Sequence, residues 1–512
     1  MTPDDQSGVS PLMGGSPTPR ARRPRHRGGP LAFIVLGLVA VVPAIGLLML
    51  YQWADEQVPA PDAAPAPSTT LVAPPPPADP LTNSFATFRR VPAPISLELN
   101  VDRFRDEVAG FVGTLNDQSC VAISVDGVEI GAQAPDLAVI PASNIKVVVA
   151  AVALDLLGTE HRYTTSVVAA TAPQNGVVEG DLVLVGGGDP LLTSAWYPTS
   201  NLERRPVFNQ TSLDTLADQV VAAGITEVRG GLLGDGSRYD DEYFAPGWGP
   251  GVAGLDAGPY DALLVNDARV LGEEQRAADP NAGAAREFAR LLRDRGVVIA
   301  GEVGAGVAPD GAVTVTSIDS VAMTDVVEEL LTNSDNNTAE LMVKELGLEG
   351  AGLGTREAGL QVMGERLASW GVDLTGVVLA DGSGLSLDNR VTCSLLLEVL
   401  QRDGSDEAIG AGLAVAAESG TLIDEFVGHE VAGRLLGKTG TLNNPPFNED
   451  PPAVKALAGY LPVDGGVDVQ YVLVLNGPTI SDQSEYRPVW SRLADVLATY
   501  PAGPTPAELG LR

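Results

Sequence analysis

The sequence of 512 residues predicts a mixed α/β (α+β) fold, in which an antiparallel sheet is flanked by helices. One observation behind this prediction is that the globular part opens with a helix pattern and a strand, and closes with three strands and a helix. The other is that the middle third has strand and turn patterns of its own. Together they indicate one domain that is split along the chain by one or two inserted domains. A single N-terminal transmembrane helix is predicted ahead of it.

The N-terminal region has the composition of a membrane anchor. Residues 1–30 carry five arginines against two aspartates and are rich in Gly, Pro and Ser, which predicts a disordered basic tail in the cytoplasm. Residues 31–51 contain no charge and are long enough to cross about 30 Å of hydrocarbon. The apolar part of a secretory signal peptide is shorter, about 7–15 residues. We therefore favour an uncleaved single-pass anchor in the cell membrane over a removed signal peptide or a buried core helix.

Residues 52–94 are predicted to be a Pro-rich linker, with nine prolines between Pro59 and Pro80. Such a stretch favours the extended polyproline II conformation and cannot supply a core. By the positive-inside rule, everything after the span lies outside the membrane. The functional part is therefore expected to be held extracytoplasmically, in the wall layer or periplasm.

The split domain is predicted over residues 95–158 and 316–512, and the inserted domain or domains over 159–315. In the first half we expect a helix over 96–114, a strand over Cys120–Val125, a turn at Asp126-Gly127 and a helix from near Ser143 to Gly158. In the insertion we expect strands over 163–171 and 181–187, a turn at Asn175-Gly176, a helix opened by Ser212, and a helix over 284–296 followed by the apolar segment 297–306. In the second half we expect helices between 320 and 371, strands near 430–441, 453–461 and 468–476, and a helix over 484–500.

The composition argues against several classes of protein. The chain has 32 Lys and Arg against 66 Asp and Glu, and its net charge of −34 disfavours nucleic acid as a partner. Three histidines and two cysteines, all far apart, give neither a metal cluster nor material for a His-based triad. The run Gly186–Gly188 lacks the spacing of a nucleotide loop, so no cofactor is predicted. Cys120 and Cys393 either pair in an oxidising compartment or remain two buried thiols.

Lysine is scarce in this chain, and the four lysines direct attention to candidate catalytic positions: Lys146, Lys344, Lys438 and Lys455. Lys146 lies three residues after Ser143 at the start of an apolar helix, which places the amine and the hydroxyl on one face. A serine hydroxyl needs a base to become a good nucleophile, and a desolvated lysine can be that base whereas an arginine cannot. N–H groups at the helix start would stabilise an oxyanion.

A second candidate group ends a predicted strand: Lys438, Thr439, Gly440 and Thr441. An ammonium and a hydroxyl there suit a substrate carboxylate, and glycine lets a ligand backbone approach closely. Between the two groups, a loop joining two predicted helices carries Ser334 and Asn336, which offer a hydroxyl for proton relay and an amide for a substrate carbonyl. Each residue taken singly has a structural alternative: an N-cap, a loop amide or a solvated strand end.

These patterns are the SxxK, SxN and KTG elements of penicillin-binding enzymes, and each occurs once, in that order. The chain resembles the serine DD-peptidases, and the 191 residues between Ser143 and Ser334 are similar to the large insertion of the type 4 penicillin-binding proteins, the D-alanyl-D-alanine carboxypeptidase/endopeptidases. The stretches over 181–194, 234–242 and 379–386 also match that group, so the resemblance covers about residues 96–500.

The resemblance implies a penicillin-binding/β-lactamase-like transpeptidase domain that hydrolyses D-alanyl-D-alanine in peptidoglycan stem peptides, with the cross-links between them as a second candidate substrate. It implies β-lactams as covalent inhibitors, and no metal or cofactor. The implied roles are Ser143 as nucleophile, Lys146 as base, Ser334 and Lys438 in proton transfer to the leaving amine, Asn336 on the substrate backbone, Thr439 with Lys438 on its carboxylate, Gly440 in the binding strand, and the N–H groups of Ser143 and Thr441 as oxyanion hole.

Two features depart from the family pattern. Leu387 follows GSGLS, where relatives often carry an arginine near a side-chain carboxylate of the substrate, and the hairpin after KTG is enlarged over 443–452. Recognition of a diamino-acid carboxylate is therefore left open. Two other functions are kept as alternatives: a β-lactamase or esterase of the same fold, and a non-catalytic wall-binding scaffold.

Overall fold

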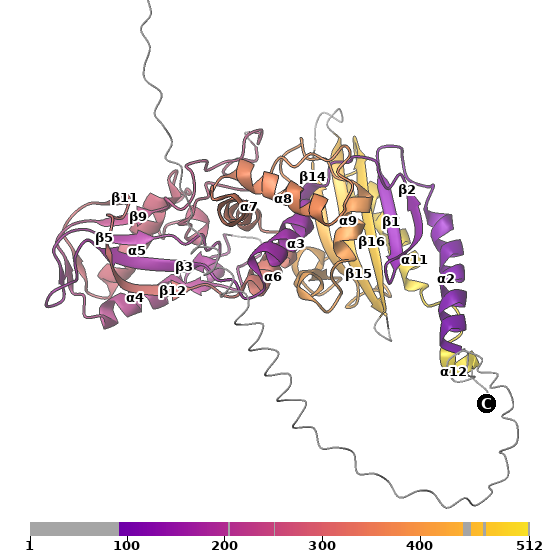
Figure 1. Ribbon diagram of the computed structural model, residues 1–512, viewed down its shortest axis with the longest axis horizontal. Helices are drawn as coiled ribbons and strands as arrows, with labels where there is room; N and C mark the ends of the chain where they lie inside the picture. The colour runs from indigo at the N-terminus through magenta and orange to yellow at the C-terminus, as the bar shows by residue number, and fades with distance from the viewer. Residues whose placement is uncertain (1–91, 203–204, 250, 444–451, 464–466, 510–512) are drawn as a thin grey trace, which may run out of the picture. The chain divides into compact units, whose positions relative to one another are not determined.

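The computed structural model describes residues 92–202, 205–249, 251–443, 452–463 and 467–509 (Figure 1). The predicted tail 1–30, the predicted transmembrane helix 31–51 and the predicted linker as far as residue 91 lie outside the described residues. No helix among those described is both long enough and apolar enough to span a membrane. All described residues belong to one compact unit.

The first described helix, α2 (Pro92–Phe111), starts four residues earlier than predicted and takes in the last residues of the predicted linker. Proline is tolerated in the first turn of a helix, because the N–H group that it lacks would have no helical partner there. The helix also stops earlier than predicted, since Gly113 adopts a positive φ of 87°. The second half of the chain returns to pack on this helix through α11 (Gln483–Ala498).

A six-stranded antiparallel sheet joins the two ends of the globular chain, as predicted. Its order is β13-β14-β15-β16-β1-β2. The strands are β1 (Cys120–Val125), β2 (Val128–Gln133), β13 (Ala414–Val415), β14 (Leu436–Leu442), β15 (Ala453–Val463) and β16 (Val467–Gly477). β1 pairs with β16 in a register that sets Cys120 opposite Val474, so the first strand of the domain depends on the last. Strands β2 and β13 had not been predicted.

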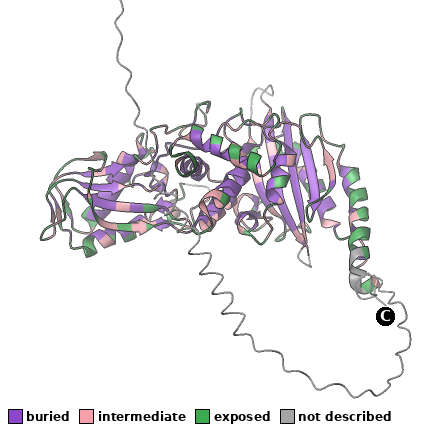
Figure 2. Ribbon diagram, in the orientation of Figure 1, coloured by how far each residue is buried: buried purple, intermediate pink, exposed green. Residues whose placement is uncertain are grey.

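Each face of this sheet is covered by helices, which gives the domain two cores (Figure 2). Along β15, Ala456 and Ala458 belong to one core and Leu457 and Leu461 to the other, as the alternation of side chains along a strand requires. α2 and α11 cover the second face. The first face shares its core with α3 (Ile145–Leu157) and α9 (Cys393–Leu400), and β14 contacts the short turn Ala142–Asn144 that precedes α3.

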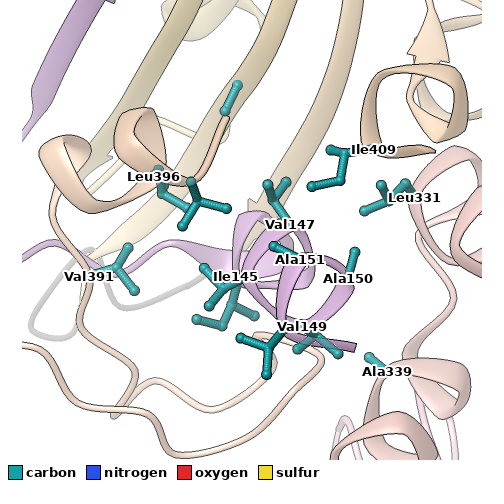
Figure 3. Packing of buried hydrophobic residues seen from close by; sticks show 14 of the residues in the cluster. Ile145, Val147, Val149, Ala150, Ala151, Leu331, Ala339, Val391, Leu396 and Ile409 are labelled. Carbon is teal, nitrogen blue, oxygen red and sulfur yellow. The ribbon is translucent and has the colours of Figure 1, made fainter. Parts of the chain in front are cut away.

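α3 is the central helix of the first core, and it is buried on all sides (Figure 3). Every residue from Ile145 to Ala153 is buried, because the segment is apolar around its whole circumference except for Lys146. Its neighbours are α6 (Met323–Asn333), α7 (Asn336–Ala351), α8 (Arg356–Ser369), α9 and α10 (Ala408–Gly412). Figure 3 shows Leu331, Ala339, Leu396 and Ile409 around it. Any polar group in the first turn of α3 is therefore removed from bulk water.

The middle of the chain builds three further sheets, with the orders β11-β9-β5-β3-β12, β10-β8-β4 and β6-β7. Their strands are β3 (Thr164–Ala169), β4 (Val177–Val178), β5 (Leu182–Val185), β6 (Leu192–Thr193), β7 (Thr211–Ser212), β8 (Glu227–Val228), β9 (Leu232–Asp235), β10 (Val298–Ile299), β11 (Val303–Ala305) and β12 (Val313–Asp319). Two helices, α4 (Leu213–Ala222) and α5 (Pro280–Asp294), pack with them around a separate apolar core. Ser212 caps α4 by accepting a hydrogen bond from the Thr215 N–H, so the helix start predicted there is confirmed.

Buried charges on α7 bind this helix to residues 238–242 in the middle of the chain. Lys344, fully buried, donates to the backbone carbonyls of Asp240 and Glu242 at 2.9 and 2.8 Å. Glu345, also buried, forms a bidentate pair with Arg238 at 2.6 and 3.0 Å. Breaking a buried pair of this kind leaves an uncompensated charge, which is costly. Lys344, the second of the four lysines along the chain, is therefore structural.

A disulfide links Cys120 at the start of β1 to Cys393 at the start of α9, with the Cα atoms 6.0 Å apart. Both residues are fully buried in the first core. The sequence had left a disulfide and two separate thiols as alternatives, since it gives no distance between two residues 273 positions apart.

Replacing both cysteines by alanine should lower the free energy of unfolding by about 2–5 kcal/mol, because the cross-link restricts a very long loop of the unfolded chain. Urea unfolding of the oxidised wild type and of the double variant measures this difference. Reduced wild-type protein is the control, and it should unfold near the midpoint of the variant. Equal midpoints for all three samples would contradict the prediction.

Candidate active site

Ser143 and Lys146 meet at the start of the buried helix. Ser143 lies in a short 3-10 turn, Ala142–Asn144, that leads directly into α3. The Lys146 Nζ is 2.9 Å from the Ser143 Oγ, 2.7 Å from the Asn336 Oδ1 and 2.6 Å from the Ser383 carbonyl oxygen. Three acceptors match the three N–H bonds of an ammonium. In the neutral form, the same nitrogen can accept the serine proton at 2.9 Å.

Burial lowers the pKa of Lys146 from 10.5 to about 8. The negative charges of Asp335, Asp381 and Glu340 act in the opposite direction and raise it. The lysine is fully buried, and its desolvation outweighs these three carboxylates. The site therefore contains a lysine that is partly neutral near neutral pH, which arginine cannot be.

A second serine–lysine pair lies beside the first. Ser334 ends α6 in the left-handed conformation, with φ 62°, and its Oγ accepts a hydrogen bond from the Lys438 Nζ at 2.8 Å. Lys438 also donates to the Thr439 carbonyl oxygen at 2.7 Å and is fully buried on β14. Burial, followed by the positive charges of Lys146 and Arg205, lowers the pKa of Lys438 well below its usual value.

Asn336 connects the first pair to the middle of the chain. It is the first residue of α7, and its Oδ1 accepts from Lys146 while its Nδ2 donates to the backbone carbonyl of Asp256 at 2.8 Å. One residue further, the Asn337 side chain accepts from the Gly258 N–H at 2.7 Å. The loop around residues 256–258 thus reaches the amide that the family resemblance assigns to the substrate backbone.

The KTG strand passes close to the turn that carries Ser143. A side chain at Gly440 would place a Cβ 2.7 Å from the Pro141 carbonyl oxygen, so only glycine allows this approach. Side chains alternate along β14, and the register pairs Thr439 with Leu457 and Thr441 with Lys455, on the face opposite to Lys438. The Thr441 hydroxyl accepts from the Lys455 Nζ at 3.0 Å, and this ammonium lies 4.2 Å from the centre of the Tyr486 ring. The structure thus brings together five of the predicted residues: Ser143, Lys146, Ser334, Asn336 and Lys438.

The loop over 381–386 supplies contacts that the residue patterns alone did not identify. Its Ser383 carbonyl faces Lys146, and the buried Glu340 fixes the loop by accepting from the Ser383 N–H at 2.7 Å. Burial, with the charge of Asp381, raises the pKa of Glu340 to about 7. Gly384 has a φ of 83°, and a Cβ there would lie 2.1 Å from the Ala142 carbonyl oxygen. In the sequence, the local sign of this loop was the pair Gly382 and Gly384 after Asp381, a composition typical of tight turns.

Of the two departures from the family pattern, the structure describes Leu387 fully and the enlarged hairpin over 443–452 only at its ends. The Leu387 carbonyl accepts a hydrogen bond from the Arg390 Nη1 at 2.7 Å, so the nearest arginine is bound to the local backbone. Of the enlarged hairpin over 443–452, residues 444–451 lie outside the described residues. Within the described part of the chain, no group of three or more His, Cys, Asp and Glu side chains is placed to hold a metal ion.

Comparison with known proteins shows the family to which the chain belongs. The model of the D-Ala-D-Ala carboxypeptidase 3 (S13) family matches residues 116–271 and 261–500. The D-alanyl-D-alanine carboxypeptidase of Actinomadura sp. (strain R39) is 30% identical over 425 residues, which cover 66% of this chain and 73% of that protein.

Solved structures show the same fold. The crystal structure of penicillin binding protein 4 (dacB) from Haemophilus influenzae has a TM-score of 0.61 at 19% identity, and covers 78% of this chain and 98% of that one. A structure of the same protein complexed with a novel β-lactam has a TM-score of 0.55 at 20% identity, with the same coverage. The mixed α/β penicillin-binding fold predicted from the sequence is therefore confirmed. The chain belongs to the D-Ala-D-Ala carboxypeptidase 3 (S13) family, and the prediction of a serine-type D-Ala-D-Ala carboxypeptidase is confirmed at the level of this family.

Proposed function

We propose that this protein hydrolyses the terminal D-alanyl-D-alanine bond of peptidoglycan stem peptides through an acyl-enzyme on Ser143. The observation that carries the proposal is the contact of 2.9 Å between the Ser143 Oγ and the Nζ of a fully buried lysine. This contact supplies the nucleophile and the base that acyl transfer needs, within hydrogen-bond reach of each other.

In the acylation step, neutral Lys146 takes the Ser143 proton while the Oγ attacks the carbonyl carbon of the penultimate D-alanine. The carbonyl oxygen becomes an oxyanion, which the N–H groups of Ser143 and Thr441 would stabilise. The C–N bond then breaks, and the leaving D-alanine takes its proton through Ser334, which lies 2.8 Å from the Lys438 Nζ. Water hydrolyses the ester and regenerates the serine. An amine of a neighbouring strand in place of the terminal D-alanine would make the same steps an endopeptidase reaction.

Asn336 would bind the substrate backbone, for which its Nδ2 must exchange the Asp256 carbonyl for a carbonyl of the substrate. Such an exchange conserves the number of hydrogen bonds. The loop around Asp256 therefore competes with the stem peptide for the same donor, and substrate binding includes a small displacement of this loop.

We further propose that the protein is anchored in the cell membrane by residues 31–51, with its N-terminus in the cytoplasm and the catalytic region outside. The uncharged run of 21 residues after an arginine-rich tail supports this. The disulfide between Cys120 and Cys393 also supports it, because disulfides persist in oxidising, extracytoplasmic compartments.

The proposed acyl-enzyme should make the protein sensitive to β-lactams. The similar penicillin binding protein 4 of Haemophilus influenzae has been solved in complex with a β-lactam. Labelled penicillin should form a covalent adduct with the wild type that resists denaturation, and Ser143→Ala should abolish it. Ser212→Ala is the matched control, since this serine caps α4 in the middle of the chain, and it should label normally.

The same proteins are then given a muropeptide pentapeptide, and the wild type should release D-alanine while Ser143→Ala should not. An adduct that persists in Ser143→Ala would overturn the nucleophile assignment. Rapid turnover of penicillin would favour a β-lactamase, and no adduct with any protein would favour a non-catalytic scaffold.

The rate of acylation should follow the neutral form of Lys146. With a pKa of about 8, the second-order rate constant for penicillin should rise about tenfold per pH unit below pH 8 and level off above it. Lys146→Arg should lose at least about a thousandfold in this rate constant and show no such rise, since arginine stays charged. Stopped-flow acylation across pH 6 to 10 measures the profile.

Removing the charge of the residue that caps α7 should shift the pH profile of acylation to lower pH. Asp335 caps α7 and raises the pKa of Lys146, so Asp335→Asn keeps the cap and removes the charge. The pKa of Lys146 should fall, and the acid limb should move to lower pH by up to about one unit. Asp279→Asn makes the same change at the cap of α5 and should leave the limb in place. A shift to higher pH in Asp335→Asn would contradict the electrostatic account.

A further inference from the structure

The three oxygens around the Lys146 amine differ in what they can do with a proton. The Asn336 Oδ1 and the Ser383 carbonyl oxygen, at 2.7 and 2.6 Å from the Nζ, can only accept a hydrogen bond. The Ser143 hydroxyl, at 2.9 Å, can either accept or donate one. A neutral amine has two N–H bonds and one lone pair. With both N–H bonds directed at the two obligate acceptors, the lone pair remains for the Ser143 proton.

Both obligate acceptors depend on α7. Asn336 opens this helix and Glu340 lies four residues later, so the two side chains lie on one face. Asn336 reaches Lys146 directly. Glu340 accepts the N–H groups of Gly382 and Ser383 through a single oxygen, Oε1, at 3.1 and 2.7 Å. The residue whose N–H group Glu340 binds is therefore the one whose carbonyl oxygen faces the amine.

The contact between Glu340 and Ser383 is closed to water, because both residues are fully buried. A buried N–H group that loses its partner stays unsatisfied, which is costly, so the loop would shift if the carboxylate were removed. Asp381 anchors the other side of the loop by accepting from the Gly384 and Ser386 N–H groups at 2.8 and 2.6 Å. Of these two anchors, Glu340 is the one that binds the residue facing the amine.

We propose that Glu340 is a positioning residue for the base of the acylation step. By holding the Ser383 carbonyl on Lys146, it keeps one N–H bond of the neutral amine occupied and directs the lone pair toward Ser143. Without this carbonyl, the amine can rotate about its Cε–Nζ bond, and the lone pair spends less time aligned with the serine proton. The inference rests on the proposed acyl-enzyme function and deepens it. Glu340 acts through the carbonyl and exchanges no proton in the proposed step.

The test compares three variants of the full-length protein by the second-order rate constant for labelled penicillin. Glu340→Ala removes the acceptor of both N–H groups. Glu340→Gln retains an oxygen at the place of Oε1 without the charge, and Glu340→Asp retains the charge but draws the oxygens back by one methylene group. The measurement is made at pH 10, above the Lys146 pKa of about 8. Removing the Glu340 charge lowers this pKa further, so the amine is neutral in every variant and a shifted pKa does not contribute to the difference.

The rate constant should fall about 10- to 100-fold in Glu340→Ala, as expected for a misaligned base. Glu340→Asp should also be slowed, whereas Glu340→Gln should retain most of the wild-type rate, because the reach of the oxygen matters and its charge does not. The total amount of adduct should remain one penicillin per protein molecule in each variant. A structural role would instead lower the amount of adduct and leave the rate constant of the labelled fraction unchanged.

Glu287→Ala is the matched control, since Glu287 is an equally buried carboxylate that accepts a backbone N–H group, that of Leu271, in the inserted region. It should acylate at the wild-type rate. The inference is overturned by a wild-type rate constant in Glu340→Ala, by less adduct at an unchanged rate, by an equal slowing in Glu287→Ala, or by a slow Glu340→Gln beside a normal Glu340→Asp. If Glu340→Ala does not fold, the pair of Gln and Asp variants decides. A wild type that forms no adduct would overturn the proposed function instead, and the wild-type assay alone shows this.

Discussion

The candidate active site depends on the burial of one amine, which is energetically unfavourable for its charged form. Lys146 lies at the beginning of α3, where the other residues from Ile145 to Ala153 are apolar and buried. α3 needs no polar residue for its packing, and Lys146 lies in the segment that its neighbours remove from water. The desolvation of this side chain lowers its pKa, and three nearby carboxylates limit how far it falls. The balance keeps the amine near the point at which it exchanges its proton, as the proposed acyl transfer requires. Apolar packing of the first core thus sets the pKa of the proposed base.

The middle of the chain contributes hydrogen bonds to the candidate site, and it is also bound to α7 by buried ion pairs. The Asp256 carbonyl accepts a hydrogen bond from Asn336, and the Pro206 carbonyl accepts one from Asn333, the residue before Ser334. Two buried charged side chains of α7, Lys344 and Glu345, bind residues 238–240 of the predicted insertion. The two serine–lysine pairs thus lie on segments of the predicted split domain, while residues of the predicted insertion contact the same candidate site.

The sequence predicted the parts of the structure that depend on local patterns. Ser143 and Lys146 are three residues apart in one helical turn, so their contact follows from spacing alone. The contact between Ser334 and Lys438 spans 104 residues and was predicted only through the family resemblance. The Ser383 and Asp256 carbonyls were not predicted, because a backbone oxygen has no residue type to reveal it. Strands of two residues, such as β13, were missed because no alternation can be recognised over such a length.

The pairing of β1 with β16 has a consequence for the order in which this protein is assembled. Cys120 lies opposite Val474, so the sheet cannot form until more than 350 further residues have been synthesised. Until then, the apolar strand β1 has no partner on this side, and the turn that carries Ser143 lacks the strand that carries Lys438. The candidate site can therefore be complete only late in synthesis, and during that interval the chain exposes an unpaired apolar strand edge, a feature that favours aggregation.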